Sequence, residues 1–364
     1  MAPVTDRHAW AEPGVEAVGD EVFRIPLPLP GDALRAVNVY AIRAGAAVTL
    51  VDAGWNAPAS WTALEQGLRR LGRPVAAVRL VAVTHLHHDH VGQAARLREA
   101  AGATLLLGQG ERPSLEQLLA DTDQGRGRLI ARLGRLGAGD LAEQLSQGGP
   151  EPQERARYEL PDLYLADGSQ VLAGERRLTV IATPGHTHGH VCLWDEGERT
   201  LFAGDHVLPH ITPSIGLEPV PARRPLADFL TSLERVRALP AERVLPAHGP
   251  VFDDLAGRVD ELLHHHQERL DACREALHPV PPGAGGVDAR EVAGRIRWTR
   301  AARRLHELNW FNQMLAVGET AAHLDVLVDR GLATGTEQDG VVRYRAACSP
   351  PSGPDPGPVT ERSP

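Results

Sequence analysis

The chain has 364 residues, of which 42% are hydrophobic, so it can bury the core of one large domain together with a smaller one. Its formal net charge of -9 argues against general attraction to nucleic acids or to anionic lipids. All 38 basic residues are arginines, and the absence of lysine excludes Schiff-base chemistry and a Walker-type phosphate loop.

The first part of the chain alternates between strand and helix patterns. The β-rich runs EVFRIPL, VNVYAI and VTLVDAG are followed by a helix candidate over 58–72 and a buried strand over 78–83. A helix over 92–101 and a strand over 104–108 come next. Residues 111–159 carry apolar residues at helical spacing, which indicates a helical excursion over the core.

Strand patterns resume after this excursion. The runs LYLA, RLTVIAT, HVCLW and TLFAG are typical of strands, and a helix over 225–239 separates them from a last strand in RVLPAHG. A long helix over 253–277 completes a large α/β domain, predicted to cover residues 17–278 after an N-terminal extension of residues 1–16.

The C-terminal part has a different character. Within residues 287–346, the helix-sized segments DAREVAGRIRW, LNWFNQMLA and ETAAHLDVLVDRG precede a hairpin with Asp339 and Gly340 at its turn. This succession predicts a small winged-helix domain. Residues 279–286 are predicted to be a linker, and residues 347–364 a disordered tail with almost nothing to bury.

Neither a targeting segment nor a disulfide framework is indicated. The N-terminus lacks the apolar core of a signal peptide, and no run approaches the roughly 20 apolar residues of a membrane span, which predicts a cytoplasmic location without a membrane partner. Cys192, Cys273 and Cys348 lack CxxC spacing, so neither disulfides nor a thiolate zinc site are expected.

The segment THLHHDH, residues 84–90, places four histidines and one aspartate in seven positions. Burying four imidazoles and a carboxylate together is costly unless a divalent cation pairs with them. On a tight turn, His85 and His87 can converge on one ion, while Asp89 and His90 point towards a second position. His88, which lies between these two pairs in the sequence, is expected to face outward.

Two adjacent ions need more ligands than this motif supplies. His186, Asp205 and His248 each follow a predicted strand, which is where α/β proteins place their sites. With its two carboxylate oxygens, Asp205 can bridge a pair of ions. The sequence therefore predicts a metal site assembled from strand ends.

This constellation resembles the metallo-β-lactamase superfamily, in particular its glyoxalase II-like hydrolases with two metals. The motif THxHxDH matches residues 84–90 at every fixed position. The resemblance implies an α/β fold, a four-layer αββα sandwich, with two Zn²⁺ ions per chain and manganese or iron as alternatives. It implies that one ion is held by His85, His87, His186 and Asp205, and the other by Asp89, His90, Asp205 and His248.

The segment GDHVLPHITPSI and the winged-helix tail are also similar to the subgroup that includes the mammalian lactamase-like protein with endoribonuclease activity. The resemblance implies hydrolysis by a hydroxide that bridges the two ions, with Asp89 orienting this nucleophile or taking its proton.

Residues near the ligands are assigned supporting roles. Asp52 ends the strand in VTLVDAG and is a candidate to hold a ligating histidine, with a helix cap or turn aspartate as the alternative. Thr84 is expected to be a turn-stabilising hydroxyl. Trp55, His206 and His210 are candidates for the substrate pocket, although a packed indole is an equal alternative for Trp55.

The favoured substrate is an activated acyl compound such as a thioester, a lactone or a similar ester. A β-lactam is less favoured, because no cysteine is available for the thiolate ligand of the first class of zinc β-lactamases. An iron-dependent persulfide dioxygenase shares part of the motif but uses one metal.

RNA cleavage is the runner-up function. Six arginines between Arg290 and Arg304 could contact phosphates. However, residues 287–346 carry nine arginines against eight acidic residues, so the region has almost no net positive charge. It is therefore predicted to be mainly a packing element or a lid over the substrate. A winged-helix regulator with an inactive hydrolase domain is disfavoured, because all seven ligands are present. The expected partner is a small-molecule substrate, and a homodimer remains open.

Overall fold

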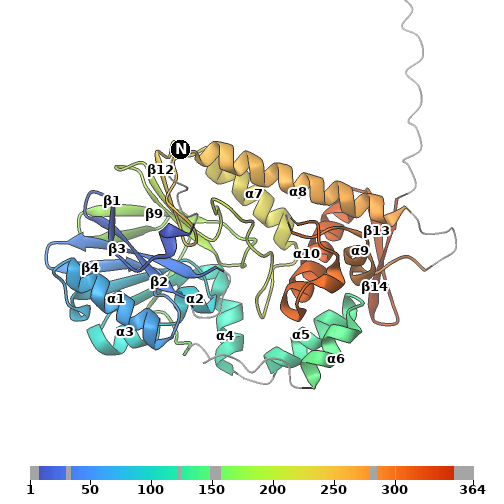
Figure 1. The fold of residues 1–364 in the computed structure, drawn as a ribbon, viewed down its shortest axis with the longest axis horizontal. Coiled ribbons are helices and arrows are strands. Elements are labelled where there is room, and N and C mark those ends of the chain that lie inside the picture. Colours follow the sequence, from blue (N-terminus) through green and yellow to red (C-terminus); the bar gives the residue numbers. More distant parts are fainter. Residues whose placement is uncertain are drawn as a thin grey trace, which may run out of the picture. The chain divides into compact units, whose positions relative to one another are not determined.

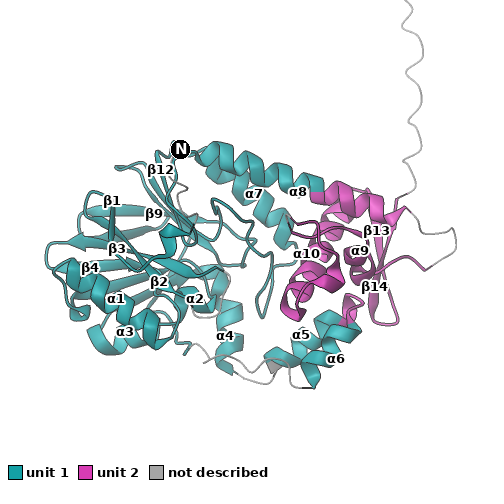
Figure 2. Ribbon diagram, in the orientation of Figure 1, with its two compact units in different colours: residues 1–133, 139–268 teal, residues 134–138, 269–364 magenta. Residues whose placement is uncertain are grey.

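The computed structural model describes residues 8–29, 34–120, 124–147, 157–278, 285–299 and 301–347. The chain divides into two units, shown in Figure 2, which comprise residues 1–133 with 139–268 and residues 134–138 with 269–364. The division falls within the long helix α8 (Leu255–Leu277), upstream of the predicted linker, most of which lies outside the described residues.

The strands of the first β-sheet in unit 1 pair in the order of the sequence, and several of them are labelled in Figure 1. Neighbouring strands are antiparallel from the first to the fourth and parallel from the fourth to the seventh. The strands are β1 (Glu16–Gly19), β2 (Val22–Pro28), β3 (Ala36–Ala44), β4 (Ala47–Val51), β5 (Val78–Val83), β6 (Thr104–Gly108) and β7 (Leu163–Leu165).

The second sheet has five strands in the order β12-β11-β10-β9-β8, and only the pair β11 and β12 is parallel. These strands are β8 (Gln170–Ala173), β9 (Arg176–Ala182), β10 (Val191–Asp195), β11 (Thr200–Gly204) and β12 (Arg243–Pro246). The four-residue edge strands β1 and β8 were not predicted. Their runs are too short to display a clear alternation of apolar and polar residues.

Side chains of β3 show how the layers are built. Val37, Val39 and Ala41 pack in a buried cluster with residues of helices α1 (Pro58–Arg70) and α3 (Ala94–Ala101). Tyr40 and Ile42 point the opposite way, into a second cluster shared with strands of the other sheet. Alternate residues of one strand therefore face a helical layer and a sheet–sheet core.

Helix α7 (Pro225–Arg237) lies against the end of β9, where Ser232 Oγ donates to the carbonyl of Pro184 at 2.9 Å. The αββα sandwich implied by the resemblance is confirmed.

The predicted helical excursion is also present. It contains α4 (Arg112–Ala120), α5 (Gln124–Arg135) and α6 (Gly139–Ser146), while residues 148–156 lie outside the described part of the chain. The helix expected from residue 92 begins at Ala94, after a separate turn of helix, α2 (His88–Val91). Single turns of 3-10 helix lie at η1 (Ala9–Ala11), η2 (Val75–Ala77), η3 (Gln109–Glu111) and η4 (Leu305–Glu307).

Two expectations about whole-chain properties can be compared with the described residues. None of the helices in those residues is long and apolar enough to cross a membrane. Cys192 and Cys273 are buried free thiols, as predicted, whereas Cys348 lies outside the described residues.

Unit 2 contains α9 (Ala289–Arg295), α10 (Trp310–Asp329) and a hairpin of β13 (Ala333–Gln338) and β14 (Val341–Ala346). The predicted turn at Asp339 and Gly340 is confirmed, with positive φ at both positions. The expectation of two helices between residues 308 and 331 is wrong, because α10 runs through Gly318 without a break. A glycine weakens a helix by about 1 kcal/mol but does not end it without a capping geometry. The winged-helix assignment stays a prediction.

Candidate metal centre

The structure brings together the seven side chains that the sequence singled out as ligands. They follow the carboxyl ends of β5, β9, β11 and β12, so both sheets contribute to the site. Within each of three overlapping groups, the possible ligand atoms all lie within 4.8 Å of one another. The groups are His85 with His87 and His186, His85 with His90 and Asp205, and Asp89 with His90 and His248.

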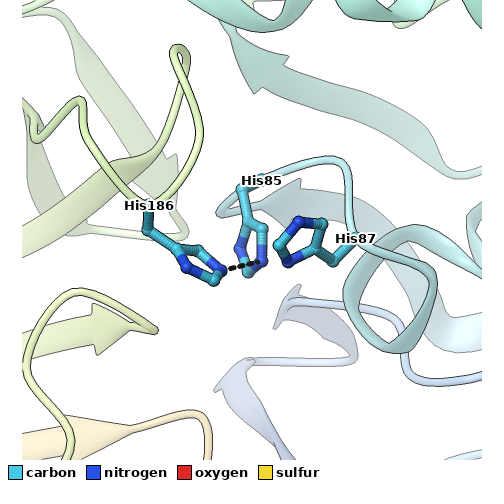
Figure 3. A group of neighbouring side chains, drawn as sticks. All are labelled: His85, His87 and His186. Atoms are coloured by element: carbon cyan, nitrogen blue, oxygen red, sulfur yellow. Dashed lines mark hydrogen bonds between the residues drawn. The ribbon is translucent and has the colours of Figure 1, made fainter. Parts of the chain in front are cut away.

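The first group, called here the three-histidine group, consists of His85, His87 and His186. Figure 3 shows the three imidazole rings converging from the turn after β5 and from the loop after β9. Their ring centroids are 4.5–4.7 Å apart, and the Nε2 atoms of His85 and His186 are separated by 3.1 Å. Burial lowers the pKa of all three histidines, so the rings are neutral and can offer lone pairs.

Hydrogen bonds on the far side of the rings decide which nitrogen faces the centre. His87 Nε2 donates to the carbonyl of Leu217 at 2.7 Å, and His186 Nδ1 donates to the carbonyl of Ser214 at 2.6 Å. Because a carbonyl can only accept, these nitrogens carry the protons. The opposite nitrogen of each ring is left with a lone pair, which is the arrangement of metal-binding histidines.

The second group, called here the aspartate group, consists of Asp89, His90 and His248. His248 Nε2 lies 3.2 Å from Asp89 Oδ2, and His90 Nε2 lies 3.6 Å from the same oxygen. His248 Nδ1 donates to the carbonyl of Ala36 at 2.8 Å, which again fixes the tautomer of the ring.

Asp205 lies between the two groups and presents one oxygen to each. Its Oδ2 is 3.5 Å from His186 Nε2, whereas its Oδ1 is 3.4 Å from His248 Nε2 and 3.6 Å from His90 Nε2. A carboxylate in this position can be shared by two cations.

Asp52 supports the aspartate group by accepting hydrogen bonds. Its Oδ2 accepts from His90 Nδ1 at 2.9 Å, and its Oδ1 accepts from the backbone N–H and the hydroxyl of Thr84 at 2.8 and 2.9 Å. Asp52 is buried and has a φ of 64°, a left-handed backbone conformation that costs a non-glycine residue free energy. Both residues therefore lie where the supporting roles predicted for Asp52 and Thr84 require them.

The donor set fits divalent cations. Burial alone would lower the pKa of His90, but the carboxylates of Asp89, Asp52 and Asp205 outweigh it and raise this pKa to about 10. The three carboxylates thus favour a positive charge at this point, which a metal ion can supply in place of the proton. Among the described residues, the buried atoms His90 Nε2 and Asp205 Oδ1 have no hydrogen-bond partner, and a cation would satisfy both.

His190 is a residue whose role the sequence did not reveal. Its Nε2 accepts from the backbone N–H of Asp205 at 3.1 Å, and its Nδ1 donates to the hydroxyl of Thr183 at 2.7 Å. The ring is completely buried, and a Cβ on Gly204, whose φ is +50°, would come within 2.5 Å of His190 Nε2. His190 therefore positions the backbone of Asp205, and its spacing from His186 in GHTHGH was the available signal.

The carbonyls of Ser214 and Leu217 were also missed. They lie in the segment between β11 and α7, which has no strand or helix. Every residue has a backbone carbonyl, so no sequence pattern could have marked these two.

The predicted pocket residues have different surroundings. Trp55 is half-buried, with its ring centroid 5.8 Å from that of His88, which in turn lies 5.5 Å from the ring of Tyr158. His88 is therefore half-buried between two aromatic rings, and it belongs to none of the groups of possible metal ligands among the described residues. The Tyr158 ring was not anticipated.

The two remaining pocket candidates follow Asp205. His206 is fully buried beside Phe229, with the ring centroids 5.1 Å apart, so its side chain is not exposed to a substrate. His210 is exposed. A pocket lined by Trp55, His206 and His210 stays a prediction, which the burial of His206 does not favour.

Comparison with known proteins decides the family. A family model described as the metallo-beta-lactamase superfamily matches residues 32–248. The chain belongs to this superfamily. A crystal structure of the metallo-beta-lactamase family protein TTHA1429 from Thermus thermophilus has a TM-score of 0.69 and 30% identity, and the match covers 91% of this chain and 100% of that one.

Two curated relatives of this superfamily member are informative. The beta-lactamase-like protein 2 homolog of Caenorhabditis elegans is 29% identical over 257 residues, which is 70% of each chain. The acyl-coenzyme A thioesterase MBLAC2 of Bos taurus is 28% identical over 269 residues, covering 71% of this chain and 88% of the relative. The chain is accordingly a hydrolase of the metallo-β-lactamase superfamily.

Proposed function

We propose that this chain is a dinuclear metal-dependent hydrolase of activated acyl compounds, with thioesters as the first substrate class. The observation that carries the proposal is the position of Asp205, whose two oxygens face the three-histidine group and the aspartate group separately. The similarity to an acyl-coenzyme A thioesterase supports the acyl substrate.

Zinc suits this donor set, because neutral imidazoles and carboxylates are common zinc ligands, with manganese and iron as alternatives. Asp205 with His85, His87 and His186 would hold one ion, and Asp205 with Asp89, His90 and His248 the other. When bound, the two ions would supply a hydroxide at neutral pH and stabilise negative charge on the acyl oxygen.

The chain itself contributes orientation and proton handling. Burial alone would raise the pKa of Asp89, but His90 and His248 outweigh it and hold this pKa below its ordinary value, so the carboxylate is ionised at neutral pH. An ionised Asp89 can orient the attacking water through a hydrogen bond and accept its proton. In the overall reaction the water oxygen bonds to the acyl carbon, the C–S bond breaks, and the thiolate leaves and takes up a proton.

The proposal is tested by metal analysis and a substrate panel on the full chain. The expected result is two metal equivalents per chain and hydrolysis of acyl-coenzyme A thioesters ahead of a lactone, a chromogenic cephalosporin and single-stranded RNA. Cleavage of the RNA alone would replace the proposal with the nucleic-acid alternative.

Variants assign the activity to this site. Asp89→Ala should abolish hydrolysis, whereas His264→Ala, which removes an exposed histidine on α8, should leave it unchanged. Survival of the activity in Asp89→Ala would mean that hydrolysis occurs elsewhere or by another mechanism.

A further inference from the structure

Two of the three rings in the three-histidine group are oriented by one short stretch of backbone, here called the 214–218 segment. The carbonyl of Ser214 accepts from His186 Nδ1 at 2.6 Å, and the carbonyl of Leu217 accepts from His87 Nε2 at 2.7 Å. The position of these two carbonyls thus sets the direction in which the opposite nitrogens of both rings point.

The 214–218 segment is also joined to the histidine loop through its own backbone. The N–H of Gly216 lies 3.0 Å from the carbonyl of Gly185 and 3.1 Å from that of His186. Gly216 has a φ of +64°, a conformation that suits glycine and turns the segment between its two histidine contacts. A displacement of this backbone would therefore move His186 and His87 together.

Side chains from the helical excursion also form hydrogen bonds with the 214–218 segment. Arg132 on α5 donates from Nη1 to the carbonyl of Gly216 at 2.9 Å. Ser114 on α4 donates to Glu218 Oε2 at 2.8 Å and accepts from the N–H of Val220 at 3.2 Å. Glu218 Oε1 accepts from the N–H of His188 at 2.6 Å, which closes a network around the histidine loop.

The aspartate group is held differently. Its histidines donate to Asp52 and to the carbonyl of Ala36, at the ends of strands in the first sheet. Neither contact involves the 214–218 segment.

We propose that the 214–218 segment, held in place by Arg132 and Ser114, is a positioning element that sets the metal affinity of the three-histidine group independently of the aspartate group. The inference rests on the proposed two-metal function. Removing an outer hydrogen-bond partner of a metal ligand lowers metal affinity by about 10–100-fold, and a residue acting through that partner should cost about tenfold. The helical excursion thus has a role in metal retention.

The test is a titration of the metal-free full-length chain with Co²⁺, followed by its d–d absorption and by competition with a chelator. Arg132→Met should weaken one of two equivalents about tenfold and alter the spectrum of that equivalent while leaving the other unchanged. Arg132→Lys, which keeps a donor and the charge, should recover part of the affinity. Arg128→Met is the matched control, because it removes the same charge from an exposed position of the same helix.

Several outcomes would overturn the inference. It fails if both equivalents are unchanged in Arg132→Met, if both weaken equally, or if Arg128→Met has the same effect. Should Arg132→Met not fold, Ser114→Ala replaces it with the same expected selectivity.

A wild-type chain that binds one equivalent would contradict the two-metal proposal alone. The positioning role would then be decided on that equivalent, since weaker binding in Arg132→Met supports it and unchanged binding refutes it.

Discussion

His90 and His248 donate to groups at the ends of core strands, whereas His87 and His186 donate to a segment without regular secondary structure. Strand ends share the stability of the buried sheets, so the supports of His90 and His248 are expected to open only at a high free energy. A loop depends on a few local hydrogen bonds and can open at a lower free energy. The two proposed metal positions therefore have separate structural supports.

Side chains of β3 also support the loop that carries His248. Asn38 on β3 is fully buried, and its Nδ2 donates to the carbonyls of Pro246 and Gly249, both at 2.9 Å. The Tyr40 hydroxyl donates to the same carbonyl of Pro246 at 2.7 Å. These bonds surround His248 on both sides along the chain, so β3 fixes the loop that carries it.

The largest effect is expected from Asp205, which both groups share. Asp205→Ala should lower thioester hydrolysis by about 10²–10³-fold or more and weaken both metal equivalents, because one oxygen serves each group. Steady-state kinetics and metal titration measure the two losses, with exposed Asp253→Ala as the control. Loss of a single equivalent would show that Asp205 belongs to one group only.

Asp52 provides the next test, since it serves the strand-end side. In Asp52→Asn the carboxylate that accepts from His90 is lost while the shape is kept, so metal affinity at the aspartate group should fall about 10–100-fold. Isothermal titration calorimetry resolves the two equivalents. The proposed division between the supports would be refuted if the three-histidine equivalent weakened more than the other.

Asn38→Ser tests the buried support around His248. The variant leaves buried carbonyls and the Arg24 guanidinium without their partner, so the free energy of unfolding should fall by about 1–3 kcal/mol. Tyr40→Phe removes one hydrogen bond to the same carbonyl and should cost about 1 kcal/mol. Urea denaturation measures the free energy of unfolding of both variants. A smaller decrease in Asn38→Ser than in Tyr40→Phe would contradict the assignment of Asn38 as the main buried support of the loop that carries His248.

The last test concerns Glu111, which accepts from the Thr187 hydroxyl beside His186 on the loop-supported side. Burial, aided by Glu218, raises the pKa of Glu111 to about 8. Because this pKa lies above the ordinary value, the folded chain holds a proton that the unfolded chain releases. The contribution of this proton to the free energy of unfolding is fully present below about pH 4.5 and is lost as the pH rises through about 8.

Glu111→Gln keeps an acceptor for Thr187 but does not titrate. The wild type should therefore lose stability relative to the variant between about pH 5 and pH 9, as followed by urea denaturation. Parallel pH profiles for the two chains would show that Glu111 is ionised throughout this range.

Much of the fold was visible in local patterns. The hairpin turn at Asp339 and Gly340 and most core strands were predicted because their signals lie within a few consecutive residues. The break predicted within α10 was wrong because helix length depends on packing as well as on one glycine. Short edge strands such as β8 escaped prediction because their pairing, rather than their composition, makes them strands.

The candidate site divides in the same way. Asp89 and the six other candidate ligands could be found because imidazoles and carboxylates are rare in such density and follow predicted strands. The position of His190 in GHTHGH marks it as a neighbour of the candidate ligand His186, but its role depends on a contact with the backbone N–H of Asp205, which local spacing does not reveal.

The sequence alone determined which atoms could bind metal, because ligand chemistry belongs to the side chain and strand ends are set by local apolar patterns. The tertiary structure decided which nitrogen of each ring faces inward, because that choice depends on carbonyls and carboxylates brought from Ala36, Asp52, Ser214 and Leu217. Backbone carbonyls are chemically identical at every position, so only folding can select the ones that hold a ligand.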